Sequence, residues 1–146
     1  MTKAELIKRL DNFSIFWLTL YGECRGEPID SQIAHAWVIR NRAIGKAYKD
    51  VCLARLQFSC WNDDDPNLAK IIAYTEGHLD GEVDIQIVLQ LKWVAEGVTS
   101  GLLSDITHGA NHYMAEWLWK SPGAPSYKNA ATGIMKFGNT VFFSCP

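Results

Sequence analysis

The sequence contains no run of apolar residues long enough to cross a membrane, which takes about 18 in a row. The apolar stretch at residues 15–20 is short, follows Asp11 and Asn12, and leads into Tyr21 rather than a small-residue cleavage site. It therefore does not look like an export signal. We expect a chain without a membrane span that is made in a cytoplasm and stays there unless something else carries it out.

An excess of charge of either sign is also missing. The chain has 14 Lys and Arg against 16 Asp and Glu, a formal net charge of -2 and a pI near 6.0. Nucleic-acid binders normally present a basic surface, and docking on anionic membranes calls for a cationic segment. We therefore expect neither nucleic acid nor a membrane as a partner.

No CxxC pair is present among the four cysteines, and there is no internal repeat or low-complexity tract. A chain of 146 residues with 48% hydrophobic residues can bury one sizeable core without disulfides. We predict a single domain over residues 1–146 in which Cys24, Cys52, Cys60 and Cys145 are mostly buried free thiols.

Apolar residues recur at helical spacing through much of the chain. They predict helices over residues 3–11, 13–21, 31–44, 65–76 and 84–99. Asp30 or Ser31 would cap the third helix, and Asp65 with Pro66 would begin the fourth. After Gly101, glycines and prolines separate short aromatic runs, and residues 111–114 and 141–143 are expected to be extended. The predicted fold class is mainly α (α+β), a small helical domain with a minor β hairpin or extended C-terminal part.

A carboxylate stands between two glycines at the end of the second apolar segment. Glu23 lies between Gly22 and Gly26, where the backbone can approach a ligand closely. Partial desolvation at such a junction would raise a carboxyl pKa, as a general acid acting on a glycosidic oxygen requires. The other interpretation is an ordinary ion pair between Glu23 or Glu27 and Arg25.

A second group of candidates lies in the expected loop at residues 56–67. Gln57, Ser59 and Trp61 combine hydrogen-bonding side chains with an aromatic ring, which suits a substrate rich in hydroxyl groups and rings. The alternative is an ordinary loop with Phe58 and Trp61 packed into the core.

A third group is formed by His108, Asn111, His112 and Tyr113. Two histidines four residues apart would share a metal on a helix, but Gly109 and the loop-rich surroundings argue against a helix here. A thiol nucleophile, Cys24 or Cys60 acting with His112, is a further option.

Five stretches of the chain, in this order, resemble the cell wall hydrolase family typified by the spore cortex-lytic enzyme SleB. They are residues 18–28 (LTLYGECRGEP), 32–42 (QIAHAWVIRNR), 57–63 (QFSCWND), 105–113 (DITHGANHY) and 136–143 (KFGNTVFF). The resemblance covers about residues 15–143. Two positions depart from the family pattern: Cys24 replaces a small residue, and Met114 stands where a second histidine is common.

The resemblance implies a lysozyme-like fold and cleavage of peptidoglycan between N-acetylmuramic acid (MurNAc) and N-acetylglucosamine (GlcNAc). It implies a lytic transglycosylase that leaves a 1,6-anhydro muramic end, with Glu23 as the catalytic acid and base and with Glu27 and Arg25 in supporting roles. The signal peptide and the wall-binding domain of the spore enzymes are not seen. We therefore expect a phage or prophage endolysin, held in the host cytoplasm until it is released to the cell wall.

These inferences combine into one expected mechanism, in which Glu23 protonates the glycosidic oxygen and the muramic C6 hydroxyl closes the anhydro ring. Peptidoglycan is the expected partner, no metal or cofactor is expected, and a monomer is favoured. The residues expected to hold the substrate are Gln57, Ser59, Trp61, Asn111, His112 and Tyr113.

The alternatives use other chemistry. They are a hydrolytic muramidase using the same glutamate, a metal-dependent amidase using His108 and His112, a cysteine peptidase, and a non-catalytic wall-binding module.

Overall fold

The computed structural model describes residues 1–55, 57–78 and 81–146. Residue 56, the first of the loop expected at 56–67, lies outside these ranges. Within them, no helix has the length and apolar character needed to span a lipid bilayer.

Three helices open the chain: α1 (Lys3–Arg9), α2 (Asn12–Cys24) and α3 (Ile29–Arg42). Helix α1 begins with a capping box between Thr2 and Glu5, and α2 begins where the Asp11 side chain accepts a hydrogen bond from the Ser14 N–H. The sequence predicted that α2 stops near Gly22, which is wrong. The helix continues to Cys24 because Gly22 is a site of close packing against another segment rather than a helix end.

Helix α3 begins two residues earlier than its expected start and ends at Arg42. Its N-cap is Pro28, with φ of −57°, and no side chain caps the helix. The prediction of an Asp30 or Ser31 cap is therefore wrong, because the fixed φ of proline already sets the chain into a helical entry.

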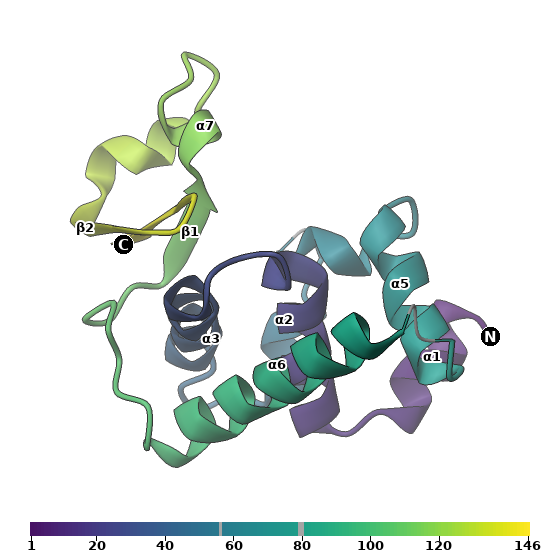
Figure 1. The fold of residues 1–146 in the computed structure, drawn as a ribbon. Coiled ribbons are helices and arrows are strands. Elements are labelled where there is room, and N and C mark those ends of the chain that lie inside the picture. The colour runs from purple at the N-terminus through teal and green to yellow at the C-terminus, as the bar shows by residue number, and fades with distance from the viewer. Residues whose placement is uncertain (56, 79–80) are drawn as a thin grey trace.

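The middle of the chain contains α4 (Tyr48–Cys52), the short 3-10 helix η1 (Ser59–Trp61), α5 (Pro66–Thr75) and α6 (Glu82–Ser100). Helix α5 starts as predicted, with the Asp65 carboxylate accepting from the Asn67 N–H at 2.8 Å. Helix α6 crosses beside α2 and α3 and completes the helical body (Figure 1).

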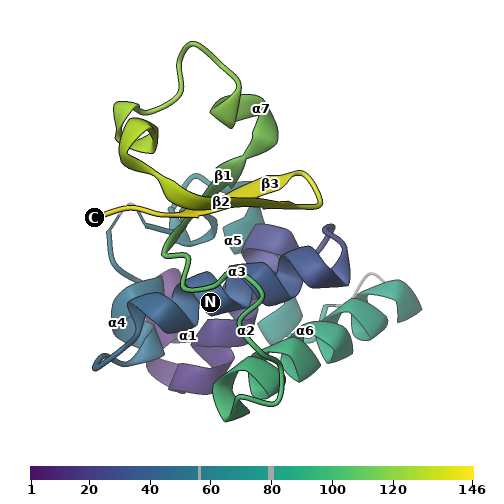
Figure 2. The ribbon, with the colours of Figure 1, turned by 90° about the vertical axis from the view of Figure 1, so that its left-hand side faces the viewer.

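The last third of the chain forms a small lobe. It contains β1 (His112–Ala115), α7 (Glu116–Trp119), the 3-10 helix η2 (Ser126–Ala130), β2 (Thr132–Phe137) and β3 (Thr140–Ser144). The three strands are antiparallel in the order β1-β3-β2, and Phe137 pairs with Thr140 across the turn of the β2–β3 hairpin. Figure 2 shows this sheet over α3, with α6 on the opposite side of α3. The predicted fold class, mainly α (α+β) with a minor hairpin, is confirmed.

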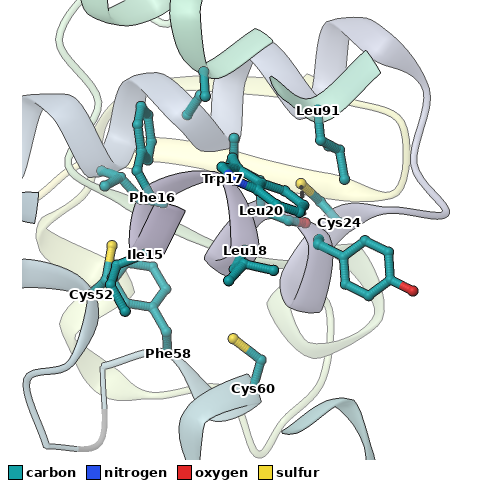
Figure 3. Close-up of a cluster of buried hydrophobic side chains, with 14 of the residues drawn as sticks. Ile15, Phe16, Trp17, Leu18, Leu20, Cys24, Cys52, Phe58, Cys60 and Leu91 are labelled. Carbon is teal, nitrogen blue, oxygen red and sulfur yellow. Dashed lines mark hydrogen bonds between the residues drawn. The ribbon is translucent and has the colours of Figure 1, made fainter. Parts of the chain in front are cut away.

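Helix α2 is the centre of the main core, because every residue from Ile15 to Cys24 except Glu23 is buried. Figure 3 shows Phe58 and Cys60 packing toward α2 from one side and Leu91 of α6 from another. The thiols of Cys24, Cys52 and Cys60 are buried and unpaired, and that of Cys145 is partly exposed and also free. This agrees with the predicted free thiols.

Candidate active site

A groove of about 420 Å³ lies where the helical body meets the sheet lobe. Its walls come from the end of α2, the end of α3, the segment around η1, strand β1 and η2. The side chains that line it are Glu23, Arg42, Gln57, Phe58, Ser59, Asn62, His112, Tyr113 and Tyr127. Five of these were predicted as site residues: Glu23, Gln57, Ser59, His112 and Tyr113.

The carboxylate of Glu23 is partly buried and is held by three donors from two other segments. The Tyr113 hydroxyl donates to Oε1 at 2.7 Å, while the Cys60 backbone N–H and the Ser59 hydroxyl donate to Oε2 at 3.2 and 3.4 Å. No ion pair among the described residues includes Glu23. The carboxylate is therefore oriented by neutral donors in the wall of the groove.

Gly22 explains why η1 can reach this carboxylate. A Cβ at Gly22 would lie 2.5 Å from the Cys60 Cβ and 2.8 Å from its Sγ, far inside van der Waals contact. Only a glycine lets α2 and η1 approach so closely, and that approach brings the Cys60 N–H to Glu23. Gly22, next to Glu23, is thus required for the close packing of α2 against η1.

Arg25 does not pair with Glu23. Its Nη1 donates to the Tyr21 carbonyl at 3.0 Å and to the Asn67 side-chain oxygen at 2.8 Å, and its guanidinium lies over the Tyr21 ring. Arg25 therefore ties the end of α2 to the start of α5 and does not line the groove.

Glu27 also points away from the groove, toward the β2–β3 hairpin. The Thr140 hydroxyl donates to its Oε1 at 2.6 Å, and a Cβ at Gly138 would lie 2.9 Å from its Oε2. Gly138 has a φ of +57°, which favours glycine at this turn position. Glu27 thus holds the hairpin against the loop that follows α2.

Tyr113 uses its hydroxyl on Glu23, which differs from the expected role of holding a substrate hydroxyl. Its ring is enclosed by His35 and Phe142, with ring centroids 4.3 and 6.0 Å away. Burial, reinforced by the nearby Glu23, raises the pKa of Tyr113 well above its usual value. The phenol therefore remains protonated and acts as a donor to the carboxylate.

His112 lines the groove, and Asn111 orients it from behind. The His112 Nδ1 lies 2.8 Å from Asn111 Oδ1, an acceptor, so Nδ1 carries the proton and Nε2 is left as an acceptor in the neutral ring. Burial, and secondarily the charge of Arg42, lowers the pKa of His112. Asn111 itself does not line the groove, because its amide pairs with the backbone of Cys145.

The expectation that Trp61 stacks on a sugar ring is corrected by its position. Trp61 is 4% exposed, and its indole N–H donates to the Thr19 hydroxyl at 2.9 Å inside the core. Thr19 offers the buried partner that an indole needs, so the ring turns inward, as the alternative interpretation of this loop held.

Four groove residues were not predicted as site residues: Phe58 and Asn62, which lie in the predicted loop, and Arg42 and Tyr127, which were missed altogether. Arg42 looks like an ordinary basic residue in the last turn of a helix, which balances the helix dipole. Tyr127 lies in a loop-rich region without any distinguishing pattern, yet it is 46% exposed and its ring centroid is 5.6 Å from that of His112. Neither position carries a local signal that separates it from a structural residue.

The structure places His108 and His112 in different surroundings, and only His112 lines the groove. His108 lies in an exposed turn with a φ of +54°, whereas His112 is on β1 in the groove wall. Over the described ranges, no three His, Cys, Asp or Glu side chains gather as a metal-binding group.

The thiols next to the groove do not fit the nucleophile of a cysteine peptidase. Burial raises the pKa of Cys52 to about 12 and also raises the pKa values of Cys24 and Cys60. A cysteine nucleophile acts as the thiolate, which these pKa values disfavour at neutral pH.

Comparison with known proteins identifies the family. No curated protein and no solved structure matches the chain. The family model described as Cell Wall Hydrolase matches residues 26–143, a range that begins just after Glu23 and contains every other residue that lines the groove. Because this match spans most of the 146 residues, the chain belongs to the Cell Wall Hydrolase family.

Proposed function

We propose that this protein cleaves the glycan strands of peptidoglycan at the β-1,4 bond between MurNAc and GlcNAc, as a lytic transglycosylase with Glu23 as acid and base. Membership of a cell wall hydrolase family supports peptidoglycan as the substrate. The observation that carries the proposal is the setting of Glu23, the one carboxylate among the described residues that line the groove.

A groove with a single carboxylate favours transglycosylation over the hydrolytic mechanisms that use a pair of carboxyl groups. Most glycoside hydrolases place a second carboxyl group about 5–10 Å from the first, as nucleophile or as base for water. Glu27 is the carboxylate nearest to Glu23 in the sequence. It accepts a hydrogen bond from the Thr140 hydroxyl of the β2–β3 hairpin and does not line the groove. A transglycosylase needs no second carboxylate, because the nucleophile is a hydroxyl of the substrate.

The proposed reaction balances with Glu23 alone. Glu23 enters protonated and gives its proton to the glycosidic oxygen as the bond to the muramic anomeric carbon breaks. The carboxylate then takes the proton of the muramic C6 hydroxyl as its oxygen bonds to the anomeric carbon. The products are a shortened strand with a free GlcNAc 4-hydroxyl and a 1,6-anhydro muramic end, and Glu23 is again protonated.

The donors around Glu23 support this cycle. Between the two proton transfers its carboxylate is negatively charged, and the Tyr113 hydroxyl and Cys60 N–H already point at its oxygens. Donors fixed in advance stabilise such a charge without reorganisation during the reaction. Tyr127 is exposed in the groove wall, so its ring can stack on a sugar, whereas the ring of Trp61 is buried.

The decisive experiment compares Glu23→Gln with the wild-type protein on purified peptidoglycan. We expect the variant to fold normally and to lose nearly all activity, because an amide cannot donate the proton. Glu96→Gln on the exposed surface of α6 is the matched control and should retain full activity. An active Glu23→Gln variant would remove Glu23 from the mechanism.

Mass spectrometry of the wild-type digest separates the two nucleophiles. Anhydro-muropeptides are the expected products. Reducing muramic ends would instead assign a hydrolytic muramidase that uses the same glutamate and a water molecule.

A further inference from the structure

The groove does not end at the residues around Glu23. A second cavity, of about 320 Å³, shares Arg42 and Gln57 with the groove, and a third, of about 450 Å³, shares Asn41 and Lys46 with the second. Cavities that share wall residues adjoin, so the three form a row of neighbouring hollows, together called the depression, from Glu23 past the end of α3. A polymer bound at Glu23 therefore has a path along which a branch can extend.

Arg42 stands at the junction between the first two cavities and is held rigidly. Its Nε donates to the Asn111 carbonyl at 2.6 Å and its Nη1 to the Gln57 side-chain oxygen at 3.1 Å, while the Phe58 ring lies 5.4 Å from the guanidinium carbon. Nη2 has no protein partner among the described residues. A fixed guanidinium with one free edge is preorganised to bind a carboxylate.

Beyond Arg42 the depression carries charges of both signs. Lys46 borders the second and third cavities, Asp50 borders the second, and Arg40 borders the third, where it stacks over Trp37 at 4.5 Å. Lys46 and Asp50 are exposed, and neither side chain forms an ion pair with any residue that the structure describes. These cations are a local feature, because the chain as a whole carries a net charge of -2.

This charge pattern matches a peptide better than a glycan. The glycan backbone of peptidoglycan is uncharged except for the lactyl carboxylate of muramic acid, which becomes an amide where a stem peptide is attached. The stem peptides carry carboxylates and, where they are not cross-linked, a free amine. Arg and Lys side chains recognise carboxylates, and a carboxylate such as Asp50 pairs with an amine.

We propose that the depression beyond Arg42 and Gln57 is a subsite for the stem peptide of the muramic acid bound at Glu23. This subsite rests on the proposed glycan cleavage. In it, the Nη2 edge of Arg42 binds a peptide carboxylate near the reaction centre. Lys46 binds a carboxylate further along, and Asp50 faces the amine. The enzyme then prefers strands that bear peptides over bare strands.

The test compares soluble glycan strands that keep their stem peptides with the same strands after an amidase has removed the peptides. The bare strands retain lactyl carboxylates, so they control for a contact with that group. We expect the wild type to have the higher kcat/KM on peptide-bearing strands. Lys46→Glu should reduce that preference about tenfold, mainly by raising KM on the peptide-bearing strands. About tenfold is the effect expected from the loss of one charge-assisted contact.

Lys8→Glu makes the same charge change on α1, away from all three cavities, and should keep the wild-type preference. Equal cleavage of both substrates by the wild type would overturn the subsite while leaving glycan cleavage intact. An equal loss by Lys46→Glu on both substrates would also overturn it, because the contact would then be with the glycan. Failure of the wild type to cut either substrate would refute the proposed function instead.

Discussion

The bond between Tyr113 and Glu23 joins residues that are 90 positions apart in the chain. Its donor is a buried phenol with a raised pKa, which keeps its proton across the neutral range. In the proposed cycle this hydroxyl stabilises the carboxylate only while Glu23 is negatively charged. The contact therefore bears on the rate more than on the binding of the strand.

We expect Tyr113→Phe to lower kcat about 10- to 100-fold, because a hydrogen bond to a charged group contributes about 1.5–3 kcal/mol. KM should change little, since the hydroxyl is engaged with Glu23 and not with substrate. Initial rates on soluble strands over a range of concentrations separate the two constants. A variant with a raised KM and unchanged kcat would show that Tyr113 holds the substrate, as the sequence predicted.

The approach of α2 and η1 at Gly22 places both the main-chain donor and the carboxylate. Helix α2 is buried over most of its length, so it cannot shift to make room for a larger residue. Any widening at Gly22 must instead move η1, and with it the Cys60 N–H and the Ser59 hydroxyl. The fit between these two elements is thus part of the site.

Gly22→Ala should destabilise the protein by about 1–3 kcal/mol, the usual cost of overpacking a core, and should also lower activity. Urea unfolding and activity on peptidoglycan measure the two effects. Gly26→Ala is the matched control, because a Cβ there meets nothing within 4 Å and the backbone φ is not positive. Wild-type stability in Gly22→Ala would contradict a tight contact between α2 and η1, because η1 would then have room for the added methyl group.

The whole molecule is a helical body and a small sheet lobe that meet at α3, and His35 lies at that junction. It is 3% exposed, its ring packs edge-on against Tyr113 and Phe142, and its Nδ1–H donates to the Ser31 carbonyl at 2.7 Å. Burial lowers the pKa of His35 from 6.5 to about 4, against smaller opposing effects of the Ser31 carbonyl and Glu27. The folded protein therefore keeps this ring neutral.

Stability should fall as the pH drops from about 6.5 toward about 4, because over this window the unfolded chain binds a proton at His35 and the folded protein does not. Between pH 7 and pH 5 the expected loss in the free energy of unfolding is about 2 kcal/mol. Urea titrations at the two pH values measure it.

His35→Phe should show a smaller loss than the wild type over the same interval. The lowered pKa of His112 acts in the same direction in both proteins, so their difference reports on His35. An equal pH dependence in both would assign the acid sensitivity to other groups.

The sequence by itself determined five of the helices, two of the three C-terminal strands and the position of the candidate acid, while α4, α7 and β2 were not predicted. Helical periodicity and capping are local properties, so α5 begins where Asp65 and Pro66 predicted, and the aromatic runs around His112 and Phe142 form β1 and β3. The motif around Glu23 was likewise visible in the chain. A glycine can mark either the end of a helix or a place where another segment packs closely against it, and the local sequence does not tell the two apart. The end of α2 was therefore predicted too early, at Gly22.

Only the tertiary structure decided which polar side chains face the groove. Trp61 turned inward because Thr19 of α2 offers a buried hydroxyl, and Glu27 turned to the hairpin because Thr140 and Gly138 lie there. Arg42 entered the site because Asn111 and Gln57 fix its guanidinium. Each direction depends on partners from other parts of the chain. Thr19 meets Trp61 inside the helical body, whereas Thr140 reaches Glu27 and the Asn111 carbonyl reaches Arg42 only when the sheet lobe packs against that body.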